Sequence, residues 1–185
     1  SALPGDDGET LGDKAARYVE AVRESVAAHD DQWRNGPADD EGHYIFRTDA
    51  PPTIHRGVVL PLNQQNALGR TLVGLGTLTG EAGYTDKARR LARFFDRRMS
   101  VRDGAAVWAY WPELGSAGFS GTGEDISHAA INVGFAVEAA RAGLVFDETD
   151  IAAMVATFAE VVTRGEAAVF DRVDGAGTSG RYDVQ

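Results

Sequence analysis

The segment PLNQQNALGRTLVGLGTLTGEAGYTDKARRLARFFDRRMS, residues 61–100, joins two helical patterns of different character. The first, over 61–79, starts at a proline and is apolar and rich in small residues, which predicts a helix packed on several sides. The second, over 85–101, has Thr85 as its expected N-cap and separates an apolar face from a face of arginines. Together they predict a hairpin of a buried inner helix and a solvent-facing outer helix.

The same alternation recurs further along the chain. A small, apolar helix is expected over 125–142, followed by an amphipathic helix over 148–163. Asp147 and Asp150 form a capping pair at the start of the latter. The two hairpins are joined by the long connection 102–124. Parallel inner helices, linked through outer helices by long connections, are typical of an α/α toroid.

We therefore predict an all-α fold, an α/α toroid of helical hairpins with short β-hairpin pieces in its loops. A helix over 9–33 and a long loop over 34–60 precede the regular part, and residues 1–185 form one domain. The hairpins are too few to close a ring, so we expect an incomplete toroid that belongs to a longer chain or completes its core by association. A generic array of hairpins, such as tetratricopeptide-like repeats, is the alternative.

Composition excludes several classes of function. The net charge of −10 disfavours a nucleic-acid partner, since phosphate binding needs concentrated positive charge. The lack of cysteine rules out disulfides, thiol nucleophiles and thiolate zinc sites. No histidine spacing or glycine loop is typical of a metal or phosphate site, so neither a metal nor a cofactor is predicted. No apolar run could span a membrane, and the polar start at Ser1 fits an exported protein, secreted or periplasmic.

The connection VWAYWPELGSAGFSGTGEDISHAAIN, residues 107–132, holds the candidate site. Trp108, Tyr110 and Trp111 form an aromatic cluster, and flat rings with a polar edge stack on the apolar faces of sugars. These rings can equally belong to the core. A glycine-rich loop then leads to carboxylates and an imidazole at the start of the next helix, which predicts a carbohydrate-handling site.

His128 is the candidate base of this site. It falls in the first turn of the expected helix, where the helix dipole opposes protonation and favours a neutral imidazole. Asp125 can orient His128 or cap the helix, and Glu124 is a candidate general acid or orienting group. The alternative for His128 is a structural hydrogen bond to the adjacent loop.

Polar residues at the start of the inner helices are the candidate substrate-binding groups. A polar run of Asn63, Gln64, Gln65 and Asn66 interrupts an otherwise apolar helix start, and Asn132 lies one turn after His128. Such amides can hold a carboxylate or sugar hydroxyls, or they can satisfy backbone groups at the helix end. The predicted substrate-binding set is Asn63, Gln64, Gln65, Trp108, Trp111, Asn132 and Arg56.

Three segments, LPLNQQNALG, VWAYWPE and GEDISHAAIN, resemble the inner-helix segments of α/α-toroid enzymes that act on uronate polysaccharides, namely the alginate-lyase-like lyases and the uronate epimerases. The resemblance covers residues 57–175 and is one of pattern. It implies Tyr110 and His128 as the acid–base pair, with Asn63, Gln64 or Gln65 near the uronate carboxylate.

We therefore expect a polysaccharide lyase that cleaves a uronate-containing polysaccharide by β-elimination, which needs a base, an acid and stabilisation of an enediolate. The net negative charge of the chain departs from this expectation, because it repels a negatively charged polysaccharide. Arginines such as Arg56 or Arg70 would have to make the cleft locally positive. One alternative is a glycoside hydrolase on the same toroid that uses Glu124 or Asp125 with a second carboxylate. The others are a uronate C5-epimerase and a non-catalytic sugar-binding or assembly domain.

Overall fold

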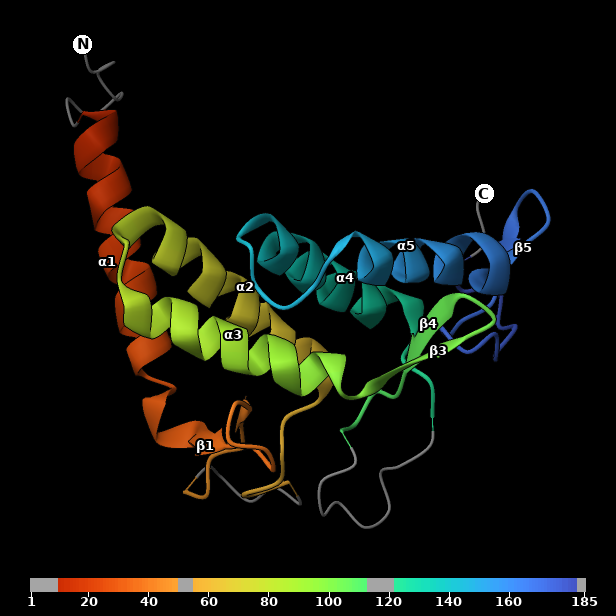
Figure 1. Ribbon diagram of the computed structural model, residues 1–185, viewed down its shortest axis with the longest axis horizontal. Helices are drawn as coiled ribbons and strands as arrows, with labels where there is room; N and C mark the ends of the chain where they lie inside the picture. Colours follow the sequence, from red (N-terminus) through yellow and green to blue (C-terminus); the bar gives the residue numbers. More distant parts are fainter. Residues whose placement is uncertain (1–9, 50–54, 113–121, 183–185) are drawn as a thin grey trace.

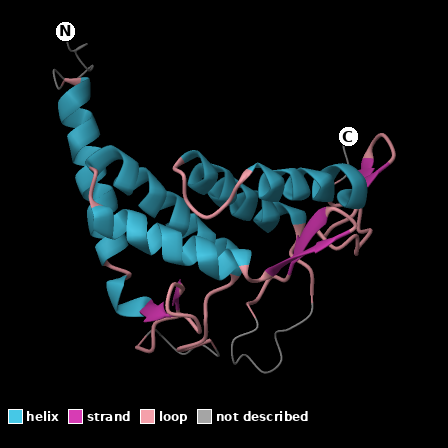
Figure 2. Cartoon of the chain, in the orientation of Figure 1, coloured by secondary structure: helices cyan, strands magenta, loops and turns pink. Residues whose placement is uncertain are grey.

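The computed structural model describes residues 10–49, 55–112 and 122–182. In these ranges the chain forms helices and three two-stranded antiparallel sheets (Figure 1, Figure 2). The helices are α1 (Leu11–Ala27), η1 (Asp30–Gln32), α2 (Leu62–Thr79), α3 (Ala82–Asp96), α4 (Ile126–Arg141), α5 (Glu148–Ala156) and the π-helical η2 (Thr157–Val162). The strands are β1 (Trp33–Asn35), β2 (Gly42–Tyr44), β3 (Met99–Arg102), β4 (Ala105–Trp108), β5 (Thr163–Arg164) and β6 (Ala168–Val169).

The prediction of an all-α toroid is wrong, because the chain has a mixed α/β fold. The physical reason is clearest at β3–β4, where the helix expected over 85–101 gives way to a hairpin. Asp103 and Gly104 have φ angles of 50° and 85°, a left-handed pair that forms a tight hairpin turn. The chain therefore reverses and pairs Val101 with Ala106 instead of continuing as a helix.

Helix α2 lies at the centre of the helical layer, between α1, α3 and α4 (Figure 1). Its small residues allow the neighbouring helices to approach closely. A Cβ at Gly69 would lie 2.6 Å from the Phe135 ring of α4, and one at Gly76 would lie 2.5 Å from the Thr85 hydroxyl of α3. The expectation that this helix is packed on several sides is confirmed.

The helix starts were predicted with mixed success. Asp147 and Asp150 form the expected capping box at α5. Thr85 is not an N-cap, because α2 ends at the left-handed Gly80 and α3 begins almost at once, with Glu81 as its N-cap. Thr85 instead lies inside α3.

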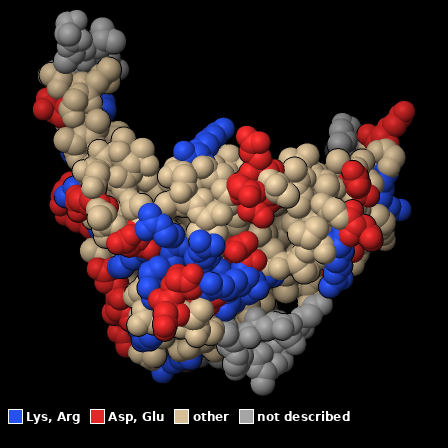
Figure 3. Space-filling view, viewed as in Figure 1, with Lys and Arg blue, Asp and Glu red and all other residues tan. Residues whose placement is uncertain are grey.

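The region expected as a long loop over 34–60 contains the β1–β2 hairpin, which ion pairs hold against α3. Arg97 donates two hydrogen bonds to the Asp40 carboxylate, at 2.6 and 3.0 Å, and Arg98 pairs with the buried Glu41 at 3.3 Å. Figure 3 shows the resulting mixture of basic and acidic groups over α3. Beneath it, the His43 ring of β2 stacks on Phe94 with centroids 5.1 Å apart.

Candidate functional site

Strand-like pairing joins the two ends of the aromatic connection. The backbone N–H of Tyr110 donates to Thr122 at 3.1 Å, and that of Glu124 donates to Trp108 at 3.1 Å. Residues 113–121, which include part of the glycine-rich loop, lie outside the described residues. The pairing places Tyr110 beside the start of α4, although many residues separate them in the chain.

The N-terminus of α2 meets the same segment. The backbone N–H of Leu62 donates to the carbonyl oxygen of Tyr110 at 3.1 Å. The first turns of α2 and α4 therefore both adjoin Tyr110. The expectation that the starts of these two helices share one site agrees with this geometry, although the ring-shaped fold that suggested it is wrong.

A cluster of polar side chains lies at the surface, at the start of α4. This surface cluster consists of Tyr110, Asp125, Ser127, His128 and Tyr182. One Asp125 oxygen caps the helix through the backbone N–H groups of Ser127 and His128, at 3.1 and 3.2 Å, and the other contacts His128 Nδ1. The His128 and Tyr110 rings lie with centroids 5.4 Å apart. The His128 side chain is 41% exposed, so its ring is accessible to a ligand.

The two roles weighed for Asp125, capping and orienting, are thus fulfilled together. Burial opposes its ionisation, but hydrogen bonds from Ser127 and His128 outweigh this effect and lower the pKa of Asp125. Burial, with the nearby carboxylates Glu124 and Asp125, raises the pKa of Tyr110. The cluster therefore presents an ionised carboxylate, an imidazole and a protonated phenol at neutral pH.

Tyr182 belongs to the surface cluster but was missed in the sequence. Its hydroxyl lies 3.3 Å from Asp125 Oδ1 and 3.4 Å from Ser127 Oγ. No local pattern indicates this contact, because it joins the C-terminal segment to the start of α4. Backbone hydrogen bonds hold the segment there. In one of them, the N–H of Ile126 donates to the carbonyl oxygen of Asp171 at 2.9 Å.

Below the surface cluster lies a buried network of Asn66, Asn132 and Glu124. Asn66 Nδ2 donates to Asn132 Oδ1 at 2.8 Å, and Asn132 Nδ2 donates to Glu124 Oε2 at 3.0 Å. All three side chains are fully buried. The network links α2 to α4 and to the residue before Asp125, so Asn132 and Glu124 act from beneath the site instead of facing a ligand.

The Glu124 carboxyl group is neutral in this environment. Burial raises its pKa to about 8, aided by the Asp125 charge and opposed by the hydrogen bond from Asn132. Its Oε1 has no hydrogen-bond partner among the described residues. Protonation removes the charge, and an uncharged carboxyl group costs much less to bury than a carboxylate.

The polar run at the start of α2 divides into structural and exposed residues. The Gln65 side chain binds both backbone groups of Tyr44, at 2.8 and 2.9 Å, and therefore fixes β2 to α2. Asn63 is buried with its Oδ1 unpartnered among the described residues, whereas Gln64 is exposed. Gln64 and Asn63 thus remain as candidate ligand groups, while Gln65 has a structural role.

The tryptophans also differ in their surroundings. Trp108 is 4% exposed and belongs to the core, whereas Trp111 is half-buried. The Trp111 ring lies 5.5 Å from that of Tyr110 and 5.4 Å from that of His55, between centroids. Arg56 follows on an exposed turn. Trp111, therefore, is the ring placed to serve as a platform beside the surface cluster.

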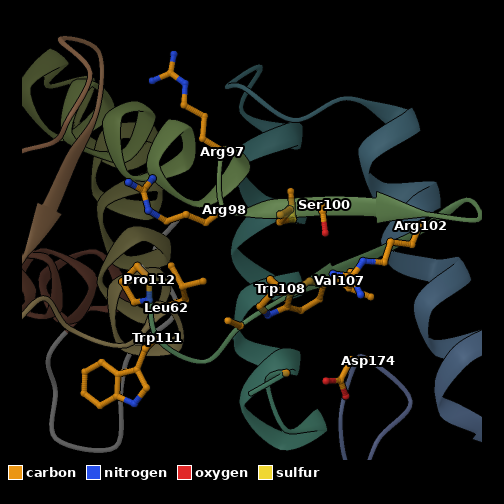
Figure 4. Close-up of a pocket in the computed structure, with 13 residues that line it drawn as sticks. Leu62, Arg97, Arg98, Ser100, Arg102, Val107, Trp108, Trp111, Pro112 and Asp174 are labelled. Carbon is orange, nitrogen blue, oxygen red and sulfur yellow. The ribbon is translucent and has the colours of Figure 1, made fainter. Parts of the chain in front are cut away.

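A cavity of about 430 Å³ opens beside β3 and β4 (Figure 4). Trp108 and Trp111 line it together with arginines from the end of α3 and from β3. Arg70, which the sequence suggested as a source of positive charge, lies instead against Gly134 of α4. The cavity was not predicted, because it depends on the unexpected β3–β4 hairpin.

Within the described ranges, no three His, Asp or Glu side chains are grouped as metal ligands, and no helix is long and apolar enough to cross a membrane. Comparisons with protein-family models, with curated proteins and with solved structures find no match to this chain.

Proposed function

We propose that this protein is a carbohydrate-active enzyme, a polysaccharide lyase that cleaves a uronate-containing polysaccharide by β-elimination. The observation that carries the proposal is the contact series Asp125–His128–Tyr110. It combines an oriented imidazole with an adjacent phenol at the protein surface. Trp111 lies against Tyr110 and offers a flat apolar ring to a sugar.

In this proposal, His128 is the base. Asp125 holds its Nδ1, so Nε2 removes the proton from C5 of the uronate. The electron pair forms the C4–C5 double bond as the C4–O4 bond breaks, and the Tyr110 hydroxyl protonates the leaving O4. Transfer of the proton from His128 to the Tyr110 phenolate restores the starting state. Because burial raises the pKa of Tyr110, the phenol is protonated at neutral pH before the reaction.

Developing negative charge on the uronate carboxylate needs stabilisation. The first turn of α2 adjoins Tyr110 and carries the positive end of the helix dipole. Within this turn the N–H groups of Leu62, Gln64 and Gln65 already donate to the carbonyl oxygens of Tyr110 and Pro61. Gln64 is exposed on this turn and can donate a further hydrogen bond.

The burial of Glu124 weighs against the hydrolase alternative. A hydrolase would need two carboxyl groups that both reach the scissile bond. Glu124 is 0% exposed and Asp125 is occupied by the helix cap and by His128. The lyase proposal requires neither group to contact the sugar.

The test is the ultraviolet absorbance of the unsaturated product during incubation with alginate, glucuronan, heparan-type and pectic polymers. We expect a rise with one of these polymers, and its loss in Tyr110→Phe and His128→Ala variants that keep the native circular dichroism spectrum. New reducing ends without absorbance would indicate hydrolysis and contradict the proposal. A flat trace with deuterium incorporated at C5 would indicate epimerisation instead.

A further inference from the structure

The cavity beside β3 and β4 is distinct from the surface cluster but borders it. Its volume, about 430 Å³, falls in the range of small-molecule sites, which is roughly 300–1,000 Å³. Trp111 lines this cavity, and the same ring lies 5.5 Å from Tyr110 between centroids. A chain of sugar residues bound at Tyr110 would therefore extend toward the cavity across Trp111.

The three arginines that line the cavity differ in their partners. Arg97 is engaged by Asp40, and Arg98 by Glu41. Arg102 is exposed and makes no ion pair with any residue in the described ranges. In Figure 4 the Arg102 side chain lies beside Val107, toward the middle of the lining residues, whereas Arg97 extends away from them. Arg102 is thus the arginine of this cavity that no carboxylate pairs with in the described ranges, although Asp174 lines the same cavity.

The remaining lining suits a sugar ring with polar edges. Trp111 and Pro112 provide apolar surface on one side, and Ser100 contributes a hydroxyl. Asp174 lies on the opposite wall, where its carboxylate can accept hydrogen bonds from sugar hydroxyls but disfavours a second anionic group. The cavity therefore favours a ligand with one negative charge on the Arg102 side and hydroxyls elsewhere.

We propose that this cavity is a subsite for an acidic sugar residue, whose carboxylate pairs with Arg102 and whose ring packs on Trp111. The choice of a uronate as the acidic sugar rests on the proposed function. The position and charge preference of the subsite follow from the cavity alone. A guanidinium can bind a carboxylate through two parallel hydrogen bonds, which distinguishes acidic from neutral sugars.

The experiment measures binding of trisaccharides by isothermal titration calorimetry, in the His128→Ala background so that the probe is not consumed. The acidic probes are β-1,4-linked trisaccharides of glucuronate and of mannuronate and the α-1,4-linked trisaccharide of galacturonate. Cellotriose is the neutral counterpart of the first. Arg102→Gln removes the charge, Arg102→Lys retains it, and Arg89→Gln is the matched control, because Arg89 pairs with Asp86 on α3 outside the cavity.

We expect Arg102→Gln to weaken binding of the preferred acidic trisaccharide at least tenfold and to leave cellotriose binding unchanged. Arg102→Lys should weaken it less, and Arg89→Gln by less than twofold. Equal affinity of Arg102→Gln and the parent for the acidic probe would overturn the subsite, as would tighter binding of cellotriose than of every acidic probe. A flat absorbance trace together with a loss of affinity in Arg102→Gln would refute the lyase and leave the subsite standing.

Discussion

Glu124 and Asp125 are neighbours in the chain and carry the same functional group, yet their pKa values move in opposite directions. Burial raises the pKa of Glu124 to about 8. Hydrogen bonds from Ser127 and His128 lower that of Asp125, although burial opposes them. One peptide unit therefore separates a neutral carboxyl group inside the protein from an ionised one at its surface, and environment alone assigns their roles.

The same contrast between burial and exposure separates the buried network, which contains Glu124, from the surface cluster, which contains Asp125. The buried network holds α2 and α4 together through Asn66, Asn132 and Glu124, without contact to solvent. The surface cluster is built on the helix start that this network supports, and its polar groups remain accessible. Disruption of the network should therefore change stability first, whereas disruption of the cluster should change activity first.

The largest expected effect is on the surface cluster. His128→Ala removes the proposed base and should lower kcat by about 10²–10⁴-fold, the usual contribution of general acid–base catalysis. The melting temperature of the His128→Ala variant should stay close to that of the parent, because the His128 ring is part of the accessible surface. The measurement is turnover of the preferred polymer. His29→Ala, which removes a ring that contacts Gln32, is the control and should retain activity.

The second effect concerns the buried network. Glu124→Ala should reduce the free energy of unfolding by about 2–4 kcal/mol, because it leaves a cavity and a buried Asn132 amide without its acceptor. Urea denaturation measures this change. Glu166→Ala, on the exposed turn between β5 and β6, should change stability by less than about 0.5 kcal/mol. A loss equally small in Glu124→Ala would contradict a structural role for the network.

The pH dependence of stability provides a third comparison. Since the pKa of Glu124 is raised from 4.5 to about 8, the folded protein retains a proton that the unfolded chain releases. This stabilising contribution is fully present below the unfolded pKa and is lost as the pH rises through about 8. Asp125, with a lowered pKa, contributes in the opposite direction, and its contribution is lost only as the solution becomes strongly acidic.

Glu124→Gln separates these two contributions, because glutamine cannot ionise but can keep the hydrogen bond from Asn132. Between about pH 5 and about pH 8, the parent should lose on the order of 3–4 kcal/mol of stability relative to this variant. Urea denaturation at both pH values gives the difference. Parallel pH profiles for the two proteins would show that Glu124 is already ionised in the folded state.

The sequence predicted the surface cluster better than the fold. Asp125 and His128 could be placed because a capping residue and the first helical turn are local features. Tyr110 could be paired with them because the aromatic run leads into the same connection. Short β-hairpin pieces were expected in the loops, but the β3–β4 hairpin was not, since it depends on two left-handed residues, one of which is not glycine.

The buried network escaped prediction for a different reason. From the sequence we expect Asn132 and Glu124 to act at the site, as a substrate-binding amide and as a candidate general acid or orienting group. Their burial depends on the contact with Asn66, which lies 66 residues before Asn132 in the chain. Tyr182 and Arg102 were missed likewise, because tertiary contacts alone bring them to the site and to the cavity. Local pattern identifies helix starts, but it does not identify which helices share a polar interior.

The smallest expected effect separates the two roles of Asp125. Asparagine caps helices about as well as aspartate, so Asp125→Asn should preserve stability within about 0.5 kcal/mol. It replaces the charged partner of His128 with a neutral amide and should lower kcat by about tenfold, since hydrogen bonds to charged groups contribute about 1.5–3 kcal/mol. Asp125→Ala should show the same loss of activity and a further loss of about 1 kcal/mol in stability. Full activity in Asp125→Asn would mean that the carboxylate serves the helix cap alone and that His128 needs no charged partner.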